Sequence, residues 1–442
     1  MKFIYADSLD FIDPRYDFAT DRNAPGRQLY WDDQYAHEFM KTPPYDGILI
    51  SRGIVGDHRF AGRYTAGQAM RFRRVGARKF LRFEGKSFSD MPIYGDCGAF
   101  SYVNEQTPPY SSQEILDFYI DGGFTHGCSV DHVIFEFDRD AKGIDSGSED
   151  ARRRFDITLE NANDFRALSR RFPAFTPLGV VQGWSPESKA VAAKKLESMG
   201  YNYLAIGGMV PLNAKSVHLC LEAIRKKIKP STRLHLLGFA KAEQIAEFTR
   251  YGIESFDSTS PLLRAFKDSR ANYYVLKPDG TLNYYAAIRI PQSTENLRLV
   301  RAAKEGRYRQ EDLVQLEARA LESVRALDKG ACSIEQALED TLAYNKLFIF
   351  DPEKSTEQNE RAVEVTRELL SSTLTDQPWR NCKCRVCESA SVEVMIFRSS
   401  NRNKRRGFHN LGVYYEYVRR ELDVEHKTSD VDVPSRRRTA KH

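Results

Sequence analysis

The chain has 442 residues, of which 41% are hydrophobic, so it is long enough to bury a large core in one barrel-sized domain with additions or in two domains. Its net charge of +5 permits a nucleic-acid partner without requiring one, and the placement of the charges is therefore more informative than their sum. No run approaches the roughly 18 apolar residues of a membrane-spanning helix, and seven cysteines, three of them bunched together, do not form a secreted disulfide framework. The first residues carry acids early and lack the apolar centre of a signal peptide, so we expect a soluble, cytoplasmic protein.

Between residues 46 and 260, short β-rich runs alternate with segments of helical length. Two of these helical segments, 185–200 and 240–252, end in glycine, the residue best suited to the left-handed conformation that closes a helix. Apolar strands that alternate with helices are typical of a parallel sheet covered by helices, and about eight such units favour a (β/α)8 TIM barrel over an open sheet. The predicted strands are 45–51, 78–84, 91–97, 132–138, 177–183, 202–208, 233–239 and 253–259.

Polar residues follow several predicted strands at the ends that would share one mouth of this barrel. Catalytic groups of such barrels lie where strands end and loops begin. The sequence therefore predicts a cluster of carboxylates, an amide and a glycine pair at this mouth. The cluster comprises Asp96, Asp138, Gln182, Gly207, Gly208 and Asp257.

After about residue 290 the alternation gives way to charged helical segments at 308–345 and 355–373, followed later by a helix over 410–422. The last residues contain few apolar side chains and several Arg and Lys, a composition typical of a disordered basic tail. We expect a catalytic barrel with an N-terminal extension over 1–290, a helical subdomain over 291–425 and the tail over 426–442.

Three of the seven cysteines fall within six residues, as Cys382, Cys384 and Cys387, and His409 follows a basic stretch. Three thiolates and one imidazole satisfy a tetrahedral Zn²⁺ ion, and four protein ligands leave no open position for water or substrate. The spacing thus predicts a structural zinc site in the C-terminal helical subdomain. Unrelated reduced cysteines, an iron–sulfur cluster and a redox site are the alternatives.

Two stretches of the chain are strongly basic. Residues 59–82 carry eight Lys or Arg and no acid, and residues 398–406 carry five more. Such stretches indicate contacts with nucleic-acid phosphates, although charge runs also occur on solvated faces that bind nothing.

Eight short blocks, in this order along the chain, resemble the motifs of the tRNA-guanine transglycosylase family. They are DCGAFS (96–101), EFD (136–138), VVQGW (180–184), AIGGM (205–209), LLGF (236–239), SFDSTSP (255–261), CKCRVC (382–387) and HNL (409–411). The resemblance implies a zinc-containing (β/α)8 barrel that exchanges guanine in a nucleic acid for a 7-deazaguanine base. The family's D-S-G-G reads DCGA here, STSPLLR replaces its C-V-L-P-T-R, and the chain carries extra length. With these departures the chain resembles the DpdA-like branch of the family, whose members insert such bases into DNA.

The resemblance also implies the roles of two carboxylates. Asp257 would attack the sugar carbon C1′ and hold the sugar covalently while the bases exchange, and Asp96 would act as general acid and base. For a lone Asp at a strand end, a helix cap or a solvated loop position is the alternative.

A flat, purine-sized base needs hydrogen-bonding groups along its edge. We expect Asp138 to accept hydrogen bonds from the amino edge of guanine, in preference to Asp131, which would lie at the start of the same predicted strand. We expect Gln182 and the backbone of Gly207 and Gly208 to read the side of the base that carries O6 and the 7-substituent.

The faces of the base require apolar or aromatic contacts. Phe100 and Met209 would enclose the ring, although ordinary core packing explains either residue almost as well.

The function expected from these observations is a DNA guanine transglycosylase that inserts 7-cyano-7-deazaguanine (preQ0), because the DNA-acting relatives use this base. A tRNA-guanine transglycosylase would need the same catalytic residues, and a non-catalytic barrel that binds nucleic acid is the alternative of another class. A target guanine in a duplex must leave the stack, so an accessory ATPase or helicase-type partner is compatible with this function. No membrane partner is expected.

Overall fold

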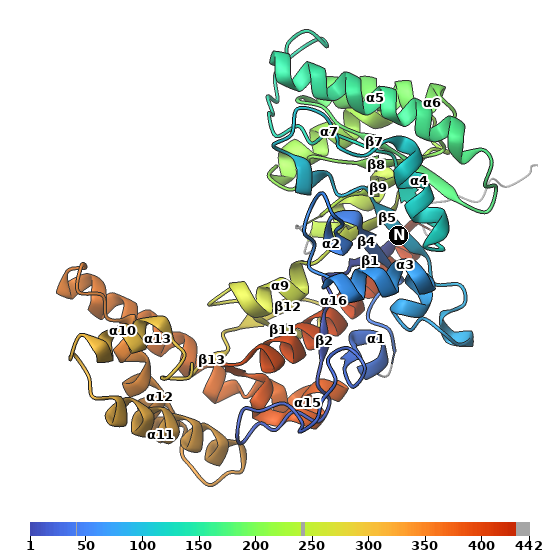
Figure 1. The fold of residues 1–442 in the computed structure, drawn as a ribbon. Coiled ribbons are helices and arrows are strands. Elements are labelled where there is room, and N and C mark those ends of the chain that lie inside the picture. The colour runs from blue at the N-terminus through green and yellow to red at the C-terminus, as the bar shows by residue number, and fades with distance from the viewer. Residues whose placement is uncertain (41, 240–243, 430–442) are drawn as a thin grey trace, which may run out of the picture. The chain divides into compact units, whose positions relative to one another are not determined.

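The computed structural model describes residues 1–40, 42–239 and 244–429, and for residue 246 and residues 423–429 only the backbone. The chain divides into two compact units, shown as a ribbon in Figure 1 and described here one at a time. The first unit contains Met1–Leu9, Tyr45–Ser260 and the chain from Val418, and the second contains Asp10–Pro44 and Pro261–Tyr417. This division differs from the boundaries expected from the sequence, because it assigns residues 10–44 and 261–290 to the second unit. Most of the expected tail, from residue 430 onward, lies outside the described residues.

Eight parallel strands of the first unit close into a barrel. The first strand pairs with both the last strand and the second, which completes the ring. This arrangement, with helices between the strands, confirms the predicted (β/α)8 TIM barrel (Figure 1). The strands are β1 (Lys2–Ala6), β4 (Gly47–Ser51), β5 (Ile93–Asp96), β6 (His126–Cys128), β7 (Thr176–Val181), β8 (Tyr203–Ile206), β9 (Arg233–Leu236) and β10 (Ile253–Ser258).

Two of the predicted strands are wrong. Residues 78–80 end a helix, and residues 132–138 form no strand, because the strand of this barrel position is β6 at His126–Cys128. The two barrel strands that take their place, β1 and β6, were not predicted. The end of this strand therefore lies at residue 128 and not at residue 138, ten residues earlier than predicted, which changes the residues expected at the barrel mouth.

The helices of the first unit begin at side chains that cap their free N–H groups. Ser111 accepts a hydrogen bond from the backbone of Glu114 in a capping box, and Asn213 accepts one from Ser216. Gly200 and Gly252 adopt φ values of 98° and 60°, as predicted for residues that follow a helical turn. These helices are α2 (Arg52–Val55), α3 (Ala66–Phe80), α4 (Ser112–Asp121), α5 (Glu149–Ser169), α6 (Pro186–Ser198), α7 (Ala214–Lys227) and α8 (Ile245–Phe248), with the 3₁₀ turns η1 (Lys86–Phe88), η2 (Ala99–Tyr102) and η4 (Thr249–Tyr251).

The barrel interior is filled by side chains from neighbouring strands β1, β4, β5, β6, β7 and β8. This buried cluster contains both aliphatic and aromatic residues, namely Ile4, Leu49, Tyr94, Cys128, Leu178, Val180, Tyr203 and Ala205. The hydroxyl groups of Tyr94 and Tyr203 lie 3.2 Å apart inside it. The interior is therefore a packed core that contains polar groups, and these groups satisfy one another.

The second unit is mainly helical. A hairpin of β11 and β12 and a short parallel pair of β13 and β14 accompany the helices. The helical segments predicted after residue 290 are confirmed, although the last helix begins ten residues earlier than expected. The elements are β2 (Phe11–Ile12), β3 (Gln34–Tyr35), α1 (Ala36–Phe39), α9 (Ser260–Lys267), β11 (Tyr273–Leu276), β12 (Leu282–Tyr285), β13 (Ile288–Arg289), α10 (Leu297–Lys304), α11 (Gln310–Asp328), α12 (Ile334–Ile349), α13 (Thr356–Asp376), α14 (Pro378–Asn381), α15 (Arg385–Ala390), η5 (Ser391–Val394), β14 (Ile396–Phe397) and α16 (Ser400–Ser429). None of the described helices has the length and apolar character needed to cross a membrane.

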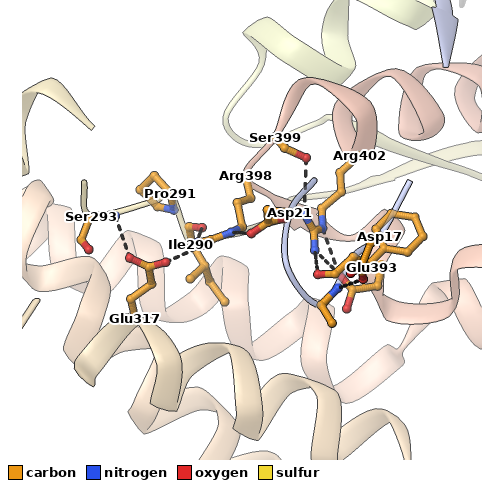
Figure 2. Close-up of polar contacts among 12 residues, drawn as sticks. Asp17, Asp21, Ile290, Pro291, Ser293, Glu317, Glu393, Arg398, Ser399 and Arg402 are labelled. Atoms are coloured by element: carbon orange, nitrogen blue, oxygen red, sulfur yellow. Dashed lines mark hydrogen bonds and ion pairs between the residues drawn. The ribbon is translucent and has the colours of Figure 1, made fainter. Parts of the chain in front are cut away.

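The basic stretch 398–406 lies inside the second unit. Arg402 is fully buried and forms ion pairs with Asp21 and Glu393, while Arg398 forms ion pairs with Asp21 and Glu317 (Figure 2). A buried guanidinium needs such partners, because the loss of its hydration is costly. The expectation that this stretch contacts phosphates is therefore wrong: its arginines hold the N-terminal segment of the unit, including Asp21, against its C-terminal part.

Candidate active site

A cavity of about 440 Å³ opens at the C-terminal ends of the barrel strands. Its volume is in the range of small-molecule sites. Most of its lining is apolar or glycine, and its six polar side chains are Ser51, Asp96, Ser101, Asp131, Gln182 and Asp257. The structure thus brings two of the three predicted carboxylates to one cavity, together with a third that the sequence analysis had set aside.

Asp257 lies near the end of β10 and is only 5% exposed. Its Oδ1 accepts a hydrogen bond from the backbone N–H of Gly238, at 2.9 Å, and lies 3.1 Å from Nε2 of His235. Both of these contacts involve Oδ1. Among the described residues, no side chain or backbone group donates a hydrogen bond to Oδ2. Within the described part of the chain, the carboxylate is therefore held through Oδ1.

Asp96 is the last residue of β5, and Gly98 donates a backbone hydrogen bond to its Oδ2 at 3.2 Å. Burial raises the pKa of Asp96 to about 6, and the charges of Asp131 and Asp257 act in the same direction, while a hydrogen bond with Ser51 opposes them. Asp96 therefore exchanges its proton close to neutral pH, as a general acid and base must.

Asp131 and Gln182 form a buried pair in the wall of the cavity. Gln182 donates from Nε2 to Oδ2 of Asp131 at 2.7 Å, and the Cys97 thiol lies 3.1 Å from Oδ1. Burial raises the pKa of the Asp131 carboxyl, and the two donors counteract that effect. Together the pair presents an amide and a carboxylate on one side of the cavity.

Asp138 does not line the cavity, which corrects the sequence prediction. It is exposed, its backbone N–H donates to Trp184, and its Oδ1 accepts from the backbone of Asp140 as in an Asx turn. The prediction failed because β6 ends at Cys128, so the strand end falls near Asp131 and not near Asp138.

Gly207 and Gly208 line the cavity as expected. A Cβ at Gly207 would lie 2.5 Å from the Gln182 amide, so only glycine leaves this wall its shape. Phe100 also lines the cavity and is 66% exposed, whereas Met209 is 1% exposed and its neighbour Val210 takes the lining position. The expectation that Met209 faces a bound ring is therefore wrong, and this side chain belongs to the core.

In the second unit, Cys382, Cys384, Cys387 and His409 place one ligand atom each within 4.8 Å of the others. The Nδ1 atom of His409 lies 3.5, 3.4 and 3.4 Å from the three sulfur atoms. Tetrahedral zinc with bonds of about 2.3 Å to sulfur and about 2.0 Å to nitrogen requires S–N separations of about 3.5 Å. The predicted four-ligand set is thus assembled and fits a metal ion of this type.

The surroundings of His409 favour the same interpretation. Its Nε2 lies 2.8 Å from the carbonyl oxygen of Tyr274, so Nε2 carries the proton and Nδ1 is free to bind a metal. The Tyr273 ring stacks on the His409 ring at 4.0 Å, and the next residue, Asn410, accepts from Tyr274 N–H and donates to the carbonyls of Pro261 and Asn272. The HNL block therefore ties α16 to the β11 hairpin of the same unit.

His235 and Ser51 contribute to the barrel site but were not predicted. Ser51 ends β4, and its register partner is Asp96 on β5. His235 is a fully buried polar residue within the apolar run LHLLGF. A histidine inside an otherwise apolar strand was the available signal, because a buried imidazole needs hydrogen-bonding partners.

Comparisons with known proteins place this geometry in context. A family model described as Queuine tRNA-ribosyltransferase matches residues 131–294. A DNA-guanine transglycosylase from Salmonella montevideo is 39% identical over 427 residues, which cover 96% of this chain and 98% of that protein.

Two further relatives match over shorter segments. A tRNA-guanine(15) transglycosylase from Pyrococcus abyssi is 28% identical over 212 residues, 47% of this chain and 32% of that protein. A Queuine tRNA-ribosyltransferase from Blochmanniella pennsylvanica is 31% identical over 137 residues, 30% of this chain and 32% of that protein. The match to the Salmonella montevideo protein thus covers nearly the whole length of both chains. The matches to the other two relatives cover about a third of each relative.

Proposed function

Because this chain belongs to the guanine transglycosylase family, we propose that it exchanges guanine in DNA for 7-cyano-7-deazaguanine through a covalent intermediate on Asp257. The observation that carries the proposal is the gathering of Asp96, Asp131 and Asp257 around one cavity. Base exchange at a nucleoside requires a nucleophile, a proton-transfer group and a group that reads the base, and these three carboxylates suit those roles.

Asp257 is proposed as the nucleophile. In the first displacement its Oδ2 attacks C1′, the bond from C1′ to N9 breaks, and the electron pair of that bond leaves with guanine. In the second displacement the corresponding nitrogen of the incoming base attacks C1′, and the bond from C1′ to Oδ2 breaks. The free carboxylate is restored, so no further reactant is needed.

Asp96 is proposed as the group that moves the proton. It protonates guanine as this base leaves and accepts the proton of the incoming base, so its protonation state is restored after each exchange. Its pKa of about 6 supports both halves of this cycle, because the protonated and the ionised forms of Asp96 are both populated near neutral pH.

Asp131 is proposed for the base-reading role first expected of Asp138. It lies in the cavity wall beside Gln182, so the pair offers acceptor oxygens to the N–H groups of a guanine and an amide to its polar edge. Gly207 and Gly208 also line the cavity, and the absence of side chains at these positions would let the base approach their backbone.

The wall behind this glycine pair favours an uncharged substituent. The fully buried Lys189 donates to the carbonyl of Gly207 at 2.8 Å, and its Nζ lies 3.1 Å from the Cβ position of Gly208. An aminomethyl substituent is a cation and needs a carboxylate as its partner, and the Lys189 amine cannot act as one. A nitrile is neutral and needs no carboxylate. This contact supports the 7-cyano base over the 7-aminomethyl base.

DNA is proposed as the nucleic acid because the relative with the near-complete match is named for DNA. Exchange in tRNA is the second candidate, since the matching family model and two partial relatives are named for tRNA. A target base in duplex DNA must leave the stack to enter the cavity, and an accessory ATPase or helicase-type partner would assist that step.

A cationic cavity of about 590 Å³ in the second unit is proposed to contact the phosphate backbone. Its lining includes Arg270, Arg289, Lys354 and Arg361 and no acidic side chain. Burial and the nearby charge of Arg298 lower the pKa of Arg289, which indicates a locally positive environment. Phosphates would relieve this repulsion, so this cavity replaces the buried stretch 398–406 as the proposed contact.

Zn²⁺ is proposed as the ion held by the three cysteines and His409. Four protein ligands fill its tetrahedral coordination, so the ion would stabilise the second unit and take no part in base exchange.

Trapping of the intermediate tests the proposed function. The protein is mixed with a guanine-containing DNA oligonucleotide, quenched with denaturant and digested, and the peptides are examined by mass spectrometry for a sugar–phosphate adduct. The expected result is an adduct on the peptide that contains Asp257, and neither adduct nor base exchange with Asp257→Asn. Undiminished exchange by that variant would remove Asp257 as the nucleophile.

A further inference from the structure

We infer that His235 is a positioning residue that holds Asp257 through a donated Nε2–H bond and speeds release of the sugar from this carboxylate. This inference rests on the proposed role of Asp257 and assigns a new role to the residue behind it. The supporting feature is a line of hydrogen-bonding side chains inside the barrel. It consists of Tyr94, Tyr203, Ser255, His235 and Asp257, and all of these residues lie in the first unit.

The line is continuous. The hydroxyls of Tyr94 and Tyr203 are 3.2 Å apart, and the Tyr203 hydroxyl lies 2.5 Å from Ser255 Oγ. Ser255 Oγ is 2.5 Å from Nδ1 of His235, whose Nε2 is 3.1 Å from Oδ1 of Asp257. Four strands contribute these residues, β5, β8, β9 and β10, so the barrel itself fixes their spacing.

One direction of hydrogen bonding along the hydroxyl groups sets the tautomer of His235 that donates to Asp257. Burial raises the pKa of Tyr94 and of Tyr203, so both phenols keep their protons. If Tyr94 donates to Tyr203, Tyr203 to Ser255, and Ser255 to Nδ1, every hydroxyl in the line has a partner. Nδ1 then accepts, and the single proton of a neutral imidazole resides on Nε2, where it is donated to Asp257.

Packing keeps the imidazole in this orientation. The Tyr94 ring stacks on the His235 ring, with centroids 5.3 Å apart and planes 23° apart. His235 and Ser255 are 0% exposed, and Tyr94 is 2% exposed. The ring therefore has little freedom to turn away from Asp257, and bulk water does not compete for its nitrogens.

The donated bond matters most when Asp257 carries a negative charge. In the covalent intermediate Oδ2 is bonded to C1′ and the ester is neutral, so Oδ1 is only a weak acceptor. When the incoming base displaces the ester, the electron pair of the C1′–Oδ2 bond returns to Asp257 and the carboxylate becomes anionic again. The N–H groups of His235 and Gly238 stabilise this charge as it develops, which makes Asp257 a better leaving group.

Removal of the His235 donor should therefore slow the second displacement more than the first. In the test, the full-length protein first forms the adduct with a DNA oligonucleotide, and 7-cyano-7-deazaguanine is then added while adduct decay is followed by rapid quench. We expect His235→Phe to form the adduct and to lose it about tenfold to a hundredfold more slowly than the wild type. His235→Gln retains an N–H donor and should recover much of the rate.

Two further variants make the test specific. Ser255→Ala removes the hydroxyl that fixes the tautomer and should also slow adduct decay, by less than His235→Phe. His218→Phe makes the same substitution on α7, where His218 contacts Glu247 and Tyr251, and should leave the decay rate unchanged.

The outcomes separate this inference from the proposed function. A wild-type protein that forms no adduct on Asp257 would contradict the proposed function. A wild type that forms the adduct, together with a His235→Phe variant that releases it at the wild-type rate, would contradict only the role of His235. Equal losses of both steps in His235→Phe and His235→Gln would also overturn it, because such losses indicate a general structural defect.

Discussion

Asp131 and Asp138 differ in their surroundings more than in their chemistry. Asp131 is 4% exposed and bonded to Gln182 in the cavity wall, whereas Asp138 is exposed in an Asx turn. A carboxylate that reads a base must lie where the base lies, so the two residues make a matched pair for mutation.

We expect Asp131→Asn to lower kcat/KM for base exchange by about tenfold to a hundredfold, because one charged acceptor is worth roughly 1.5–3 kcal/mol. Asp138→Asn should change kcat/KM by less than about twofold. Steady-state exchange of labelled guanine measures both variants. A larger loss for Asp138→Asn would return the base-reading role to that residue.

The raised pKa of Asp96 predicts a pH-dependent stability. The folded state holds the Asp96 proton up to a pKa of about 6, whereas the ordinary pKa of an Asp carboxyl in an unfolded chain is 3.8. Between these values the folded protein binds more protons, so the contribution of Asp96 is favourable below the lower value and is lost as the pH rises through about 6.

Asp96→Asn removes this titration. Urea unfolding between pH 4.5 and 7.5 should show the variant gaining stability over the wild type as pH rises, by on the order of 1–2 kcal/mol after allowance for partial exposure. A difference that stays constant with pH would show that the Asp96 pKa is not raised.

At the scale of elements, the sequence predicted six of the eight barrel strands at nearly their observed positions. These strands are continuous apolar runs that helices flank on both sides, the pattern that burial on two faces imposes. The strand β6 has only three residues, His126, Gly127 and Cys128, and too few apolar side chains to show that pattern.

The glycine of β6 has a reason that only the structure shows. A Cβ at Gly127 would lie 2.5 Å from the ring of Tyr119, so this strand must be small where α4 packs on it. The buried apolar residues Val133 and Ile134 led to the prediction of a strand in the wrong segment. The residue expected to read the base was therefore placed at the end of that segment, at Asp138. The basic stretch 398–406 was misinterpreted for a related reason, since its buried partner Asp21 is more than 370 residues away in sequence.

The cluster of Cys382, Cys384, Cys387 and His409 joins α15 and α16. Cys384→Ser should abolish stoichiometric zinc and destabilise the second unit by several kcal/mol, since binding a structural ion contributes directly to folding. Zinc content by elemental analysis and thermal unfolding with and without a chelator provide the measurement. Cys332→Ser, which changes a cysteine outside the cluster, should retain zinc and its unfolding temperature.

The cationic cavity makes a separate prediction about β13 and α13, which carry Arg289 and Arg361. Arg289→Gln combined with Arg361→Gln should weaken DNA binding and reduce the slope of log K against log salt by about one to two, because each lost phosphate contact releases about one counterion fewer. Arg309→Gln removes a charge that Asp312 already pairs at 2.7 Å and should leave the slope unchanged. An unchanged slope in the double variant would contradict the proposed contact.

For the whole molecule, the proposed activity combines a barrel that exchanges bases with a second unit that binds metal and phosphate. Each unit has its own candidate site, and the match to the DNA-guanine transglycosylase from Salmonella montevideo covers 96% of this chain. The proposed catalytic residues do not distinguish DNA from tRNA, since either nucleic acid presents guanine on a sugar. A direct measurement of which nucleic acid is modified therefore tests the central proposal.

That measurement is the incorporation of radiolabelled 7-cyano-7-deazaguanine by the purified full-length protein into DNA and into unmodified tRNA, offered separately and in competition, with Asp257→Asn as the inactive control. Single-stranded and duplex DNA are both included, because an unassisted protein has to open the duplex. We expect label in DNA, none in tRNA and none with the variant. Label that enters tRNA and not DNA would contradict the proposed action on DNA.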